Sequence, residues 1–305
     1  MLDLKIQEDN ISRSYIPGDQ WVYFKLYCGP KTGDKILVNV IREVSETLLK
    51  SQKIHRWFFI RYSDPDFHIR VRFNFTQKEA ISDIITMMTE SLEYFVKENL
   101  VWKVVIDTYQ REIERYGLNT MDEAETIFYH DSQMIVDFLE MIEGEDGERY
   151  RWLFSLRAMD AILSDFHLDT ESKMEVMFRI SQSFGKEHNK DEQLARQLSK
   201  KFREEKKAIQ DILNPEKDEE SEMKPALDLI QQKSEKVKEP IKQIIKIRNE
   251  SKLIVQFDDL ISSYLHMFNN RLFRSKNRIH EMVVYDFLFR VLKSRVAREK
   301  YAKKG

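Results

Sequence analysis

The stretch WFFIRYSDPDFHIRVRF, residues 57–73, decides the fold of the N-terminal third of the chain. Residues 57–62 are rich in aromatic and β-branched side chains, 63–66 have the Asp-Pro composition of a turn, and 68–73 alternate polar and apolar side chains. This pattern predicts a hairpin or a close pair of strands. Because side chains alternate along a strand, we expect one apolar face and one cationic face.

The segments around this hairpin supply further strands and helices. Residues 21–27 (WVYFKLY) are rich in aromatic residues and precede a Gly-Pro turn, which predicts a strand. Apolar residues recur at helical spacing over 33–50 and 77–98, which predicts helices there. The pattern of residues 101–113 predicts another strand. From about residue 120 the pattern is mostly helical, and glycine (8) and proline (6) are scarce. We therefore expect an α+β fold: a mixed sheet from the N-terminal third packed with many helices, and a helix-rich C-terminal half.

The segment 186–250 is dense in Lys, Glu and Gln and has few apolar positions. We interpret it as a charged, insertion-like region of exposed helices, broken at Pro215 and Pro240 and containing a solvated loop near 214–224. After it, residues 252–298 regain a strong apolar period.

Composition limits the classes of function. The 305 residues are 42% hydrophobic, enough to fold around a core, and 50 Lys and Arg nearly balance 52 Asp and Glu. The net charge of -2 gives no overall attraction to nucleic acid or membranes, so we expect no direct nucleic-acid binding. The single cysteine, Cys28, is typical of a reduced, cytoplasmic protein. We find no signal-peptide pattern and no apolar run near the roughly 20 residues that span a bilayer.

Several common catalytic patterns do not occur. The sequence has no GxxxxGK[ST], GxGxxG, GxSxG or HExxH motif, which argues against the corresponding nucleotide-binding, hydrolase and zinc sites. The seven histidines are not paired at the spacing of metal ligands, so a zinc site has little support.

The cationic hairpin is the first candidate site. Arg61, His68, Arg70 and Arg72 lie within twelve residues, and the last three share a face if the segment is a strand. One interpretation is a solvated outer face neutralised by nearby Asp and Glu. The other is a pocket for a carboxylate or phosphate, which arginine grips with its planar fork.

Two further pairs have both a structural and a functional interpretation. Glu112 and Arg115 are three residues apart and would share a helix face, as a surface ion pair worth roughly half a kcal/mol or as part of a site. His266 and Asn270 are four apart among apolar neighbours. Such a histidine is more often a core residue, but an imidazole side chain is suited to proton transfer near neutral pH if it lines a site.

Together these segments resemble the C-terminal domain of lantibiotic dehydratases, which also occurs alone in thiopeptide-type bacteriocin pathways. The likeness spans about residues 18–298, and the FIRYxDPxxHIRxR stretch is specific, whereas 186–250 match no motif. The resemblance implies a single elimination-type domain over 1–305. The residues that carry it are Trp21, Lys25-Leu26-Tyr27, Phe59-Ile60-Arg61-Tyr62-Ser63-Asp64-Pro65, His68-Ile69-Arg70-Val71-Arg72, Asp107-Thr108-Tyr109-Gln110-Arg111-Glu112, Arg115-Tyr116-Gly117, Phe128-Tyr129-His130-Asp131-Ser132, His266-Met267 and Asn269-Asn270-Arg271-Leu272.

The resemblance also implies a reaction. In that family a separate domain esterifies Ser and Thr side chains of a peptide with glutamate from glutamyl-tRNA. The elimination domain then removes the glutamate and leaves dehydroalanine or dehydrobutyrine. The catalytic residues implied are Glu112, Arg115, His266 and a strand arginine, for which Arg72 is preferred to Arg70. The substrate-binding residues implied are Arg61, His68, Arg70, Asn270 and Arg271.

The chemistry explains why such residues are needed. β-Elimination removes a weakly acidic α-proton and expels a carboxylate, so it requires a base and nearby positive charge. We expect His266 to do acid/base work, alone or shared with Glu112. We expect Arg72 and Arg115 to hold the glutamyl group.

Partners and rival functions follow from the same resemblance. It implies no metal or organic cofactor, a precursor peptide as substrate and a separate tRNA-dependent glutamylating protein as partner. Family members often dimerise, so a homodimer is a further expectation.

Two rival functions stay open: a thiopeptide pyridine synthase-like cycloaddition of two dehydroalanines, and a non-catalytic, peptide-binding role beside a glutamylating protein. Joint presence of Glu112, Arg115 and His266 favours elimination. An extended peptide could also enter by adding a strand to a sheet edge.

Overall fold

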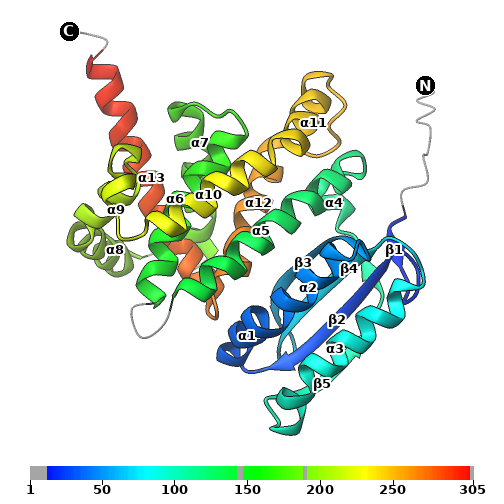
Figure 1. Ribbon diagram of the computed structural model, residues 1–305. Helices are drawn as coiled ribbons and strands as arrows, with labels where there is room; N and C mark the ends of the chain where they lie inside the picture. Colours follow the sequence, from blue (N-terminus) through cyan, green and yellow to red (C-terminus); the bar gives the residue numbers. More distant parts are fainter. Residues whose placement is uncertain (1–11, 143–146, 188–190, 303–305) are drawn as a thin grey trace.

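The protein combines a small layered α/β unit with a large array of helices (Figure 1). A computed structural model describes residues 12–142, 147–187 and 191–302. The described strands all lie within residues 14–110 and the later elements are helices, so the expected α+β class is confirmed, whereas the sheet expected to be mixed is antiparallel.

The main sheet has four antiparallel strands in the order β3-β4-β2-β5. These strands are β2 (Trp21–Cys28), β3 (Ile54–Ser63), β4 (Phe67–Phe75) and β5 (Val101–Ile106). The predicted hairpin is therefore confirmed as β3 and β4. A separate pair joins β1 (Ser14–Tyr15) to β6 (Tyr109–Gln110), so the strand predicted over 101–113 is in fact two pieces.

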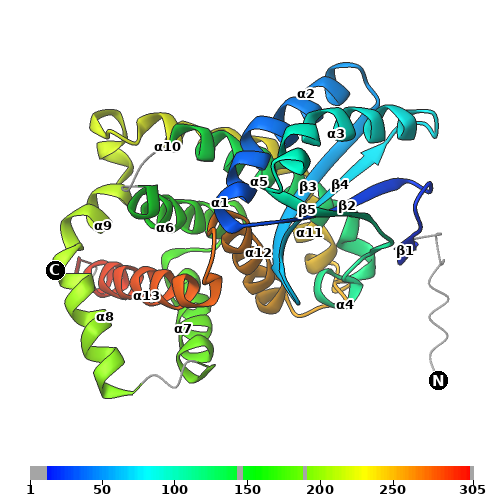
Figure 2. The same ribbon diagram turned by 90° about the horizontal axis from the view of Figure 1, so that it is seen from below.

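Helices cover one face of this sheet (Figure 2). They are α1 (Pro30–Ile36), the π-helical turn η1 (Leu37–Ile41), α2 (Arg42–Lys50) and α3 (Ala80–Lys97), where helices were predicted. On β4, Ile69, Val71 and Phe73 point into this layer and are fully buried. His68, Arg70 and Arg72 alternate with them and lie on the opposite face, as predicted.

The helical array fills the rest of the chain. In the first half it contains α4 (Ile113–Tyr116), the 3₁₀ turn η2 (Leu118–Thr120), α5 (Met121–Met141), α6 (Gly147–Asp165) and α7 (Thr170–Glu187). It continues with α8 (Glu192–Glu204), α9 (Lys206–Ile212), the 3₁₀ turn η3 (Pro215–Glu220), α10 (Lys224–Lys236), α11 (Lys238–Asn249), α12 (Phe257–Leu272) and α13 (Asn277–Ala302).

The described part of the charged region, residues 186–187 and 191–250, is better packed than predicted. Pro215 follows a break, but the expected loop there contains η3, whose start is capped by the Asn214 side chain. The break predicted at Pro240 lies three residues earlier, at Val237 between α10 and α11, so the proline stands in the first turn of α11, where proline fits a helix. Apolar residues such as Ile209 and Ile244 are buried, since these helices pack on α5, α6 and α13.

Side chains from α5 and α12 close the outer edge of β3. Asn270 Oδ1 accepts a hydrogen bond from the Arg61 N–H (3.0 Å), and its Nδ2 donates to the Arg61 carbonyl (2.9 Å). Arg271 Nε donates to the Phe59 carbonyl (2.8 Å), and Ser132 Oγ accepts from the Phe59 N–H (3.2 Å). Backbone groups that an edge strand would leave unpaired are thus satisfied by the helical array.

An ion cluster centred on Asp34 of α1 also joins the sheet to the helical array. The Asp34 carboxylate lies 2.7 Å from Arg61 of β3, 2.6 Å from Arg151 of α6 and 2.7 Å from Arg274, between α12 and α13. Burial acts to raise the pKa of Asp34, but Arg61, Arg151 and Arg274 outweigh it and hold the pKa below its ordinary value. The carboxylate is therefore ionised in the folded protein.

Replacing Arg271 with methionine tests the closure of the β3 edge. The change leaves the Phe59 and Met267 carbonyls without the donors that Arg271 supplies, so we expect a loss of about 2–4 kcal/mol in unfolding free energy. Urea unfolding measures it. Arg196→Met, at an exposed ion pair on α8, is the matched control and should change stability by less than about 0.5 kcal/mol. Equal unfolding midpoints for the two variants would contradict this account of the edge.

The Asp34 cluster predicts a specific pH dependence. Because its folded-state pKa lies below the ordinary value of 3.8, its contribution to stability is present above that value and is lost as the pH falls below it. Asp34→Asn leaves three arginines without their carboxylate and should cost about 3–5 kcal/mol near neutral pH. Urea unfolding at several pH values should show the gap between wild type and variant shrinking below about pH 4. A gap of constant size would rule out this role for Asp34.

Candidate functional site

The sheet face opposite α1–α3 carries a row of cations and aromatic rings. The register places Tyr23 opposite Arg72, Lys25 opposite Arg70 and Tyr27 opposite His68, across β2 and β4. On the other side, Phe58, Ile60 and Tyr62 of β3 flank the same three residues. The predicted grouping of His68, Arg70 and Arg72 is therefore present, and it is interleaved with aromatic side chains.

Arg72 lies at the centre of this face and is buried. Its guanidinium carbon is 4.3 Å from the ring centre of Tyr23, 4.8 Å from that of Tyr109 and 5.1 Å from that of Phe58. Burial lowers its pKa from the ordinary value, while Tyr23, Tyr109 and Glu112 act in the opposite direction. Among the residues that the structure describes, no carboxylate lies within ion-pair distance of it, and its Nε and Nη1 have no hydrogen-bond partner. Cation–π contacts compensate only part of the cost of burying such a charge, which leaves Arg72 suited to an external anion.

Arg70 is held beside it by the local chain. Its Nε donates to His68 Nε2 (2.9 Å), and His68 Nδ1 lies 2.8 Å from the carbonyl of Asp66. Burial first, and then Arg70 and Lys25, lower the pKa of His68, so the ring is neutral with its proton on Nδ1. The Arg70 guanidinium stacks 3.5 Å from the Tyr62 ring centre. His68 thus orients Arg70, and within the described part of the chain no carboxylate lies at ion-pair distance from Arg70, although Asp107 lines the same cavity.

An open cavity of about 470 Å³ lies over Arg70 and Arg72. Its lining carries both signs of charge, and Lys25 and Asp107 form an ion pair within it. The hydrogen bond from Lys25 is the main reason that the pKa of Asp107 is lowered. A small cavity of about 30 Å³ adjoins it and shares Arg72, Gln110 and Glu112. The larger cavity is lined by Arg13, Tyr23, Lys25, Arg70, Arg72, Asp107, Thr108, Gln110, Arg111, Glu112 and Glu114.

Glu112 and Arg115 form the predicted pair at the start of α4. Arg115 Nε lies 3.0 Å from Glu112 Oε2, and both side chains are about half exposed. Glu112 lines both cavities, whereas Arg115 lines neither and contacts the site through Glu112. Gly117 ends α4 with φ of 79°, and a Cβ there would lie 2.9 Å from Thr120 Oγ1, so glycine is required where the chain turns toward α5.

His266 is oriented by a residue that the sequence did not single out. Its Nδ1 lies 2.6 Å from Oε1 of Glu281, a fully buried carboxylate of α13, while 27% of the His266 side chain is exposed. Glu281 also accepts from the Tyr285 hydroxyl (3.1 Å). His266 does not line either cavity, although its neighbour Met267 lines the smaller one. With Nδ1 held by a carboxylate, Nε2 is the nitrogen available for proton transfer.

Three of the predicted binding residues lie in the framework instead. Arg61 is out of phase with Ile60 and Tyr62, so it faces the helical layer and Asp34. Asn270 uses its amide on the backbone of Arg61, and Arg271 uses two donors on backbone carbonyls. Of these three, only Arg271 reaches a cavity, the smaller one.

A second residue missed from the sequence, Glu125, builds the wall around Arg72 together with Tyr109 and Arg111. The buried carboxylate of Glu125, on α5, accepts hydrogen bonds from Arg111 Nε (2.7 Å), Arg111 Nη2 (2.6 Å) and the Tyr109 hydroxyl (2.8 Å). This contact fixes the Tyr109 ring against Arg72. No sequence signal pointed to Glu125, because Asp122 and Glu123 lie beside it on α5.

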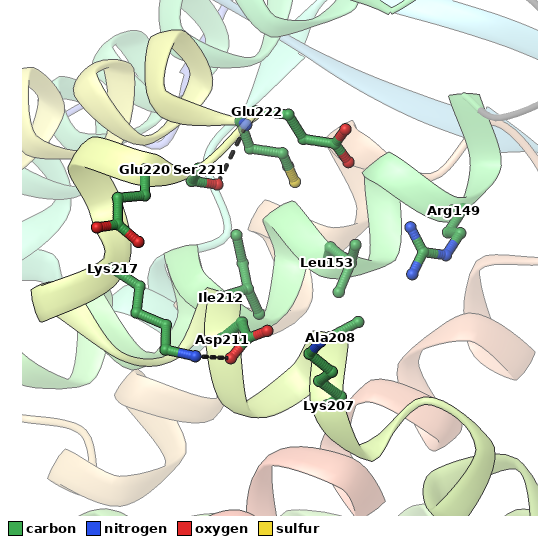
Figure 3. Close-up of a pocket in the computed structure, with 11 residues that line it drawn as sticks. Arg149, Leu153, Lys207, Ala208, Asp211, Ile212, Lys217, Glu220, Ser221 and Glu222 are labelled. Carbon is green, nitrogen blue, oxygen red and sulfur yellow. Dashed lines mark hydrogen bonds and ion pairs between the residues drawn. The ribbon is translucent and has the colours of Figure 1, made fainter.

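Another cavity, of about 380 Å³, lies among α6, α9 and η3 (Figure 3). Lys217 pairs there with Asp211, and Arg149 lies 3.4 Å from Glu205, while Leu153 and Ile212 add apolar surface. The lining holds three cations and three carboxylates, so its charges balance and it is a weaker anion site than the cavity over Arg72. The cations are Arg149, Lys207 and Lys217, and the carboxylates are Asp211, Glu220 and Glu222.

Comparison with known proteins identifies the class to which this fold and site belong. The family described as lantibiotic biosynthesis dehydratase C-term matches residues 21–292, including the charged region 186–250, and the chain belongs to it.

Individual relatives are much longer proteins. The chain is 28% identical over 192 residues to the subtilin biosynthesis protein SpaB of Bacillus subtilis, which covers 62% of this chain and 18% of SpaB. It is 28% identical over 148 residues to the nisin biosynthesis protein NisB of Lactococcus lactis subsp. lactis, covering 47% and 14%. The chain therefore spans less than a fifth of either curated relative.

Solved structures share the fold. The tRNA-dependent lantibiotic dehydratase MibB of Microbispora sp. 107891 superposes with a TM-score of 0.72 at 19% identity, covering 92% of this chain and 29% of MibB. The pyridine synthase TbtD from thiomuracin biosynthesis superposes with a TM-score of 0.65 at 10% identity, covering 90% and 99%. TsrL gives a TM-score of 0.64 at 10% identity, covering 93% and 96%.

The described residues lack two kinds of feature, a membrane-spanning helix and a metal-binding group. None of their helices combines the length and apolar character needed to cross a membrane. Nor do these residues contain a group of three or more His, Cys, Asp and Glu side chains arranged to hold a metal ion.

Replacing Arg72 with methionine should separate stability from function. The change removes a buried charge that has no carboxylate partner within the described ranges and keeps a side chain of similar length among three rings. We therefore expect the variant to unfold at the same temperature as wild type or higher, within about 1–2 kcal/mol. Thermal unfolding by circular dichroism measures this. A loss of stability as large as that of Arg271→Met would mean that Arg72 is a structural residue.

Proposed function

We propose that the protein eliminates glutamate from glutamylated Ser and Thr side chains of a ribosomally made precursor peptide, producing dehydroalanine and dehydrobutyrine. Membership of the dehydratase C-terminal family supports this class of function. The observation that carries the proposal is the pair Arg70 and Arg72, which face an open cavity and have no described carboxylate within ion-pair distance.

The charges of the substrate match this cavity. A glutamyl group esterified through its α-carboxyl group keeps a free γ-carboxylate and a free α-ammonium group. Arg72, with Arg70 beside it, would bind the γ-carboxylate, and the cations of the lining would stabilise the glutamate as its ester bond breaks. Arginine in a partly dry cavity makes stronger contacts with such anions than it would in water.

The reaction needs one proton transfer and one bond cleavage. A base removes the α-proton of the modified residue, the electron pair forms the Cα–Cβ double bond, and the Cβ–O bond breaks to release glutamate. Glu112 lines both cavities, and its charge acts on Arg72, so we assign it as the base. His266, held by Glu281 and offering Nε2, would share the acid/base work, and Arg115 would fix Glu112.

The glutamyl group must come from a second activity. We propose that a tRNA-dependent glutamylating protein or domain outside residues 1–305 attaches it, and that the protein acts on the modified peptide without an organic cofactor.

The proposal predicts a measurable loss of glutamate from a defined substrate. A synthetic peptide with one O-glutamyl serine should lose the mass of glutamic acid on incubation with the protein. Arg72→Met, Glu112→Gln and His266→Ala should each lower kcat/KM by roughly 10²–10³-fold, because each removes charge stabilisation or proton transfer. Mass spectrometry follows the product, and Arg196→Met serves as the unaffected control. Wild-type rates in all three site variants would overturn the proposal.

A second candidate is the cycloaddition of two dehydroalanines. It is favoured by the match to the pyridine synthase TbtD along 99% of its length. A peptide carrying two dehydroalanines separates the candidates: a cyclised product with no activity on the glutamylated peptide would favour the synthase. Glutamate release alone would favour elimination.

A further inference from the structure

The two edge strands of the main sheet differ in whether their outward backbone groups have hydrogen-bond partners. At the β3 edge, side chains of Ser132, Asn270 and Arg271 bind the outward backbone groups. At the β5 edge, the structure describes no such partner for the backbone of residues 102–106. One edge is therefore closed by the fold, and the other is available for pairing.

The register shows which groups of β5 face outward. The Asp107 N–H donates to the carbonyl of Tyr23 (3.0 Å), and β2 and β5 pair with Lys25 opposite Val105. In an antiparallel ladder, the residues between such hydrogen-bonded pairs direct their N–H and C=O groups to the other side. Val104 and Ile106 thus present donors and acceptors along the outer edge.

The side chains of this edge are also exposed and largely apolar. Trp102 is 53% exposed, Val104 is 41% exposed and Ile106 is 38% exposed. Proline, which commonly protects edges, is absent from β5, and Lys103 is the one charged residue of the strand. Lys103 lies on the cationic face, with its Nζ 5.1 Å from the Tyr27 ring centre, and no described carboxylate pairs with it.

β5 leads directly into the cavity over Arg72. The next residues, Asp107, Thr108 and Gln110, are part of its lining. A chain paired with β5 would therefore deliver its adjoining residue to the cavity. This continuity indicates a partner that is extended and that also matches the charges of the cavity. A second copy of this folded chain does not meet both conditions.

We propose that an extended segment of the peptide substrate adds as an antiparallel strand to the outer edge of β5 and positions the modified residue over Arg72. This inference rests on the proposed function. Apolar side chains of the peptide pack beside Trp102, Val104 and Ile106, and alternate positions, next to Lys103, favour acidic side chains.

The test uses two probes that carry a glutamyl group through a stable amide on diaminopropionate. The long probe adds alternating Val and Glu residues sufficient to pair with all of β5, and the short probe is the blocked modified residue alone. Val104→Pro removes an outward N–H while keeping the bonds of Lys103 and Val105 to β2. Val104→Thr keeps the N–H and the β-branched shape and is the matched control.

Fluorescence anisotropy should show that Val104→Pro binds the long probe roughly ten-fold more weakly, whereas Val104→Thr binds as wild type does. All three proteins should bind the short probe equally. A scan of wild type with long probes N-methylated at single positions should alternate between weak and normal binding, which tests strand pairing even if Val104→Pro fails to fold.

Each failure has a distinct meaning. Unchanged long-probe binding by Val104→Pro, or an N-methyl scan without alternation, overturns the strand proposal. Loss of a dimer on Val104→Pro in sedimentation velocity, with normal long-probe binding, would assign the edge to a second copy and also overturn it. Failure of wild type to bind the short probe or to release glutamate from the O-glutamyl peptide would instead remove the proposed function.

Discussion

Closure of the β3 edge by α5 and α12 is the constraint on which the rest of the structure depends. Hydrogen bonds from Ser132, Asn270 and Arg271 join the sheet to helices that lie about seventy to two hundred residues later in the chain. With this edge fixed, α5 brings Phe128 against Phe58 of the sheet, and Glu125 orients Tyr109 against Arg72. Lys25 and Arg70, further along the same face, are only partly buried and line the larger cavity. A framework interaction therefore determines how much of the cationic face is accessible.

The arginines of the cationic face differ from those of the framework in how their charges are compensated. Arg61 and Arg151 share Asp34, and Arg111 has Glu125, so their charges are compensated within the fold. Arg72 has aromatic rings in place of a carboxylate, an arrangement that costs stability and leaves an anion site open. Elimination of glutamate would use such a site, because the substrate carries one carboxylate and the reaction creates another. The open β5 edge beside it would then serve the peptide backbone rather than the reacting group.

Sequence reasoning predicted the hairpin, its two faces and the helix-rich second half because these depend on local periodicity. It predicted that His68, Arg70 and Arg72 share a face for the same reason. It could not distinguish the roles of Asn270 and Arg271, because hydrogen bonds to the β3 backbone depend on the three-dimensional approach of α12. Glu281 and Glu125 escaped notice because a buried carboxylate has no sequence pattern of its own. The break near Pro240 was predicted three residues too late, because proline is accepted in the first turn of a helix and the break at Val237 precedes it.

The central claim is that Arg72 binds the γ-carboxylate of a glutamyl group. Calorimetric titration with two stable amide-linked probes, one glutamyl and one glutaminyl, tests it most directly, because the probes have the same shape and differ in one charge. The account predicts that wild type binds the glutamyl probe roughly 10–100-fold more tightly, and that Arg72→Met binds both alike. Equal affinity of wild type for both probes, or an undiminished preference in Arg72→Met, would contradict it.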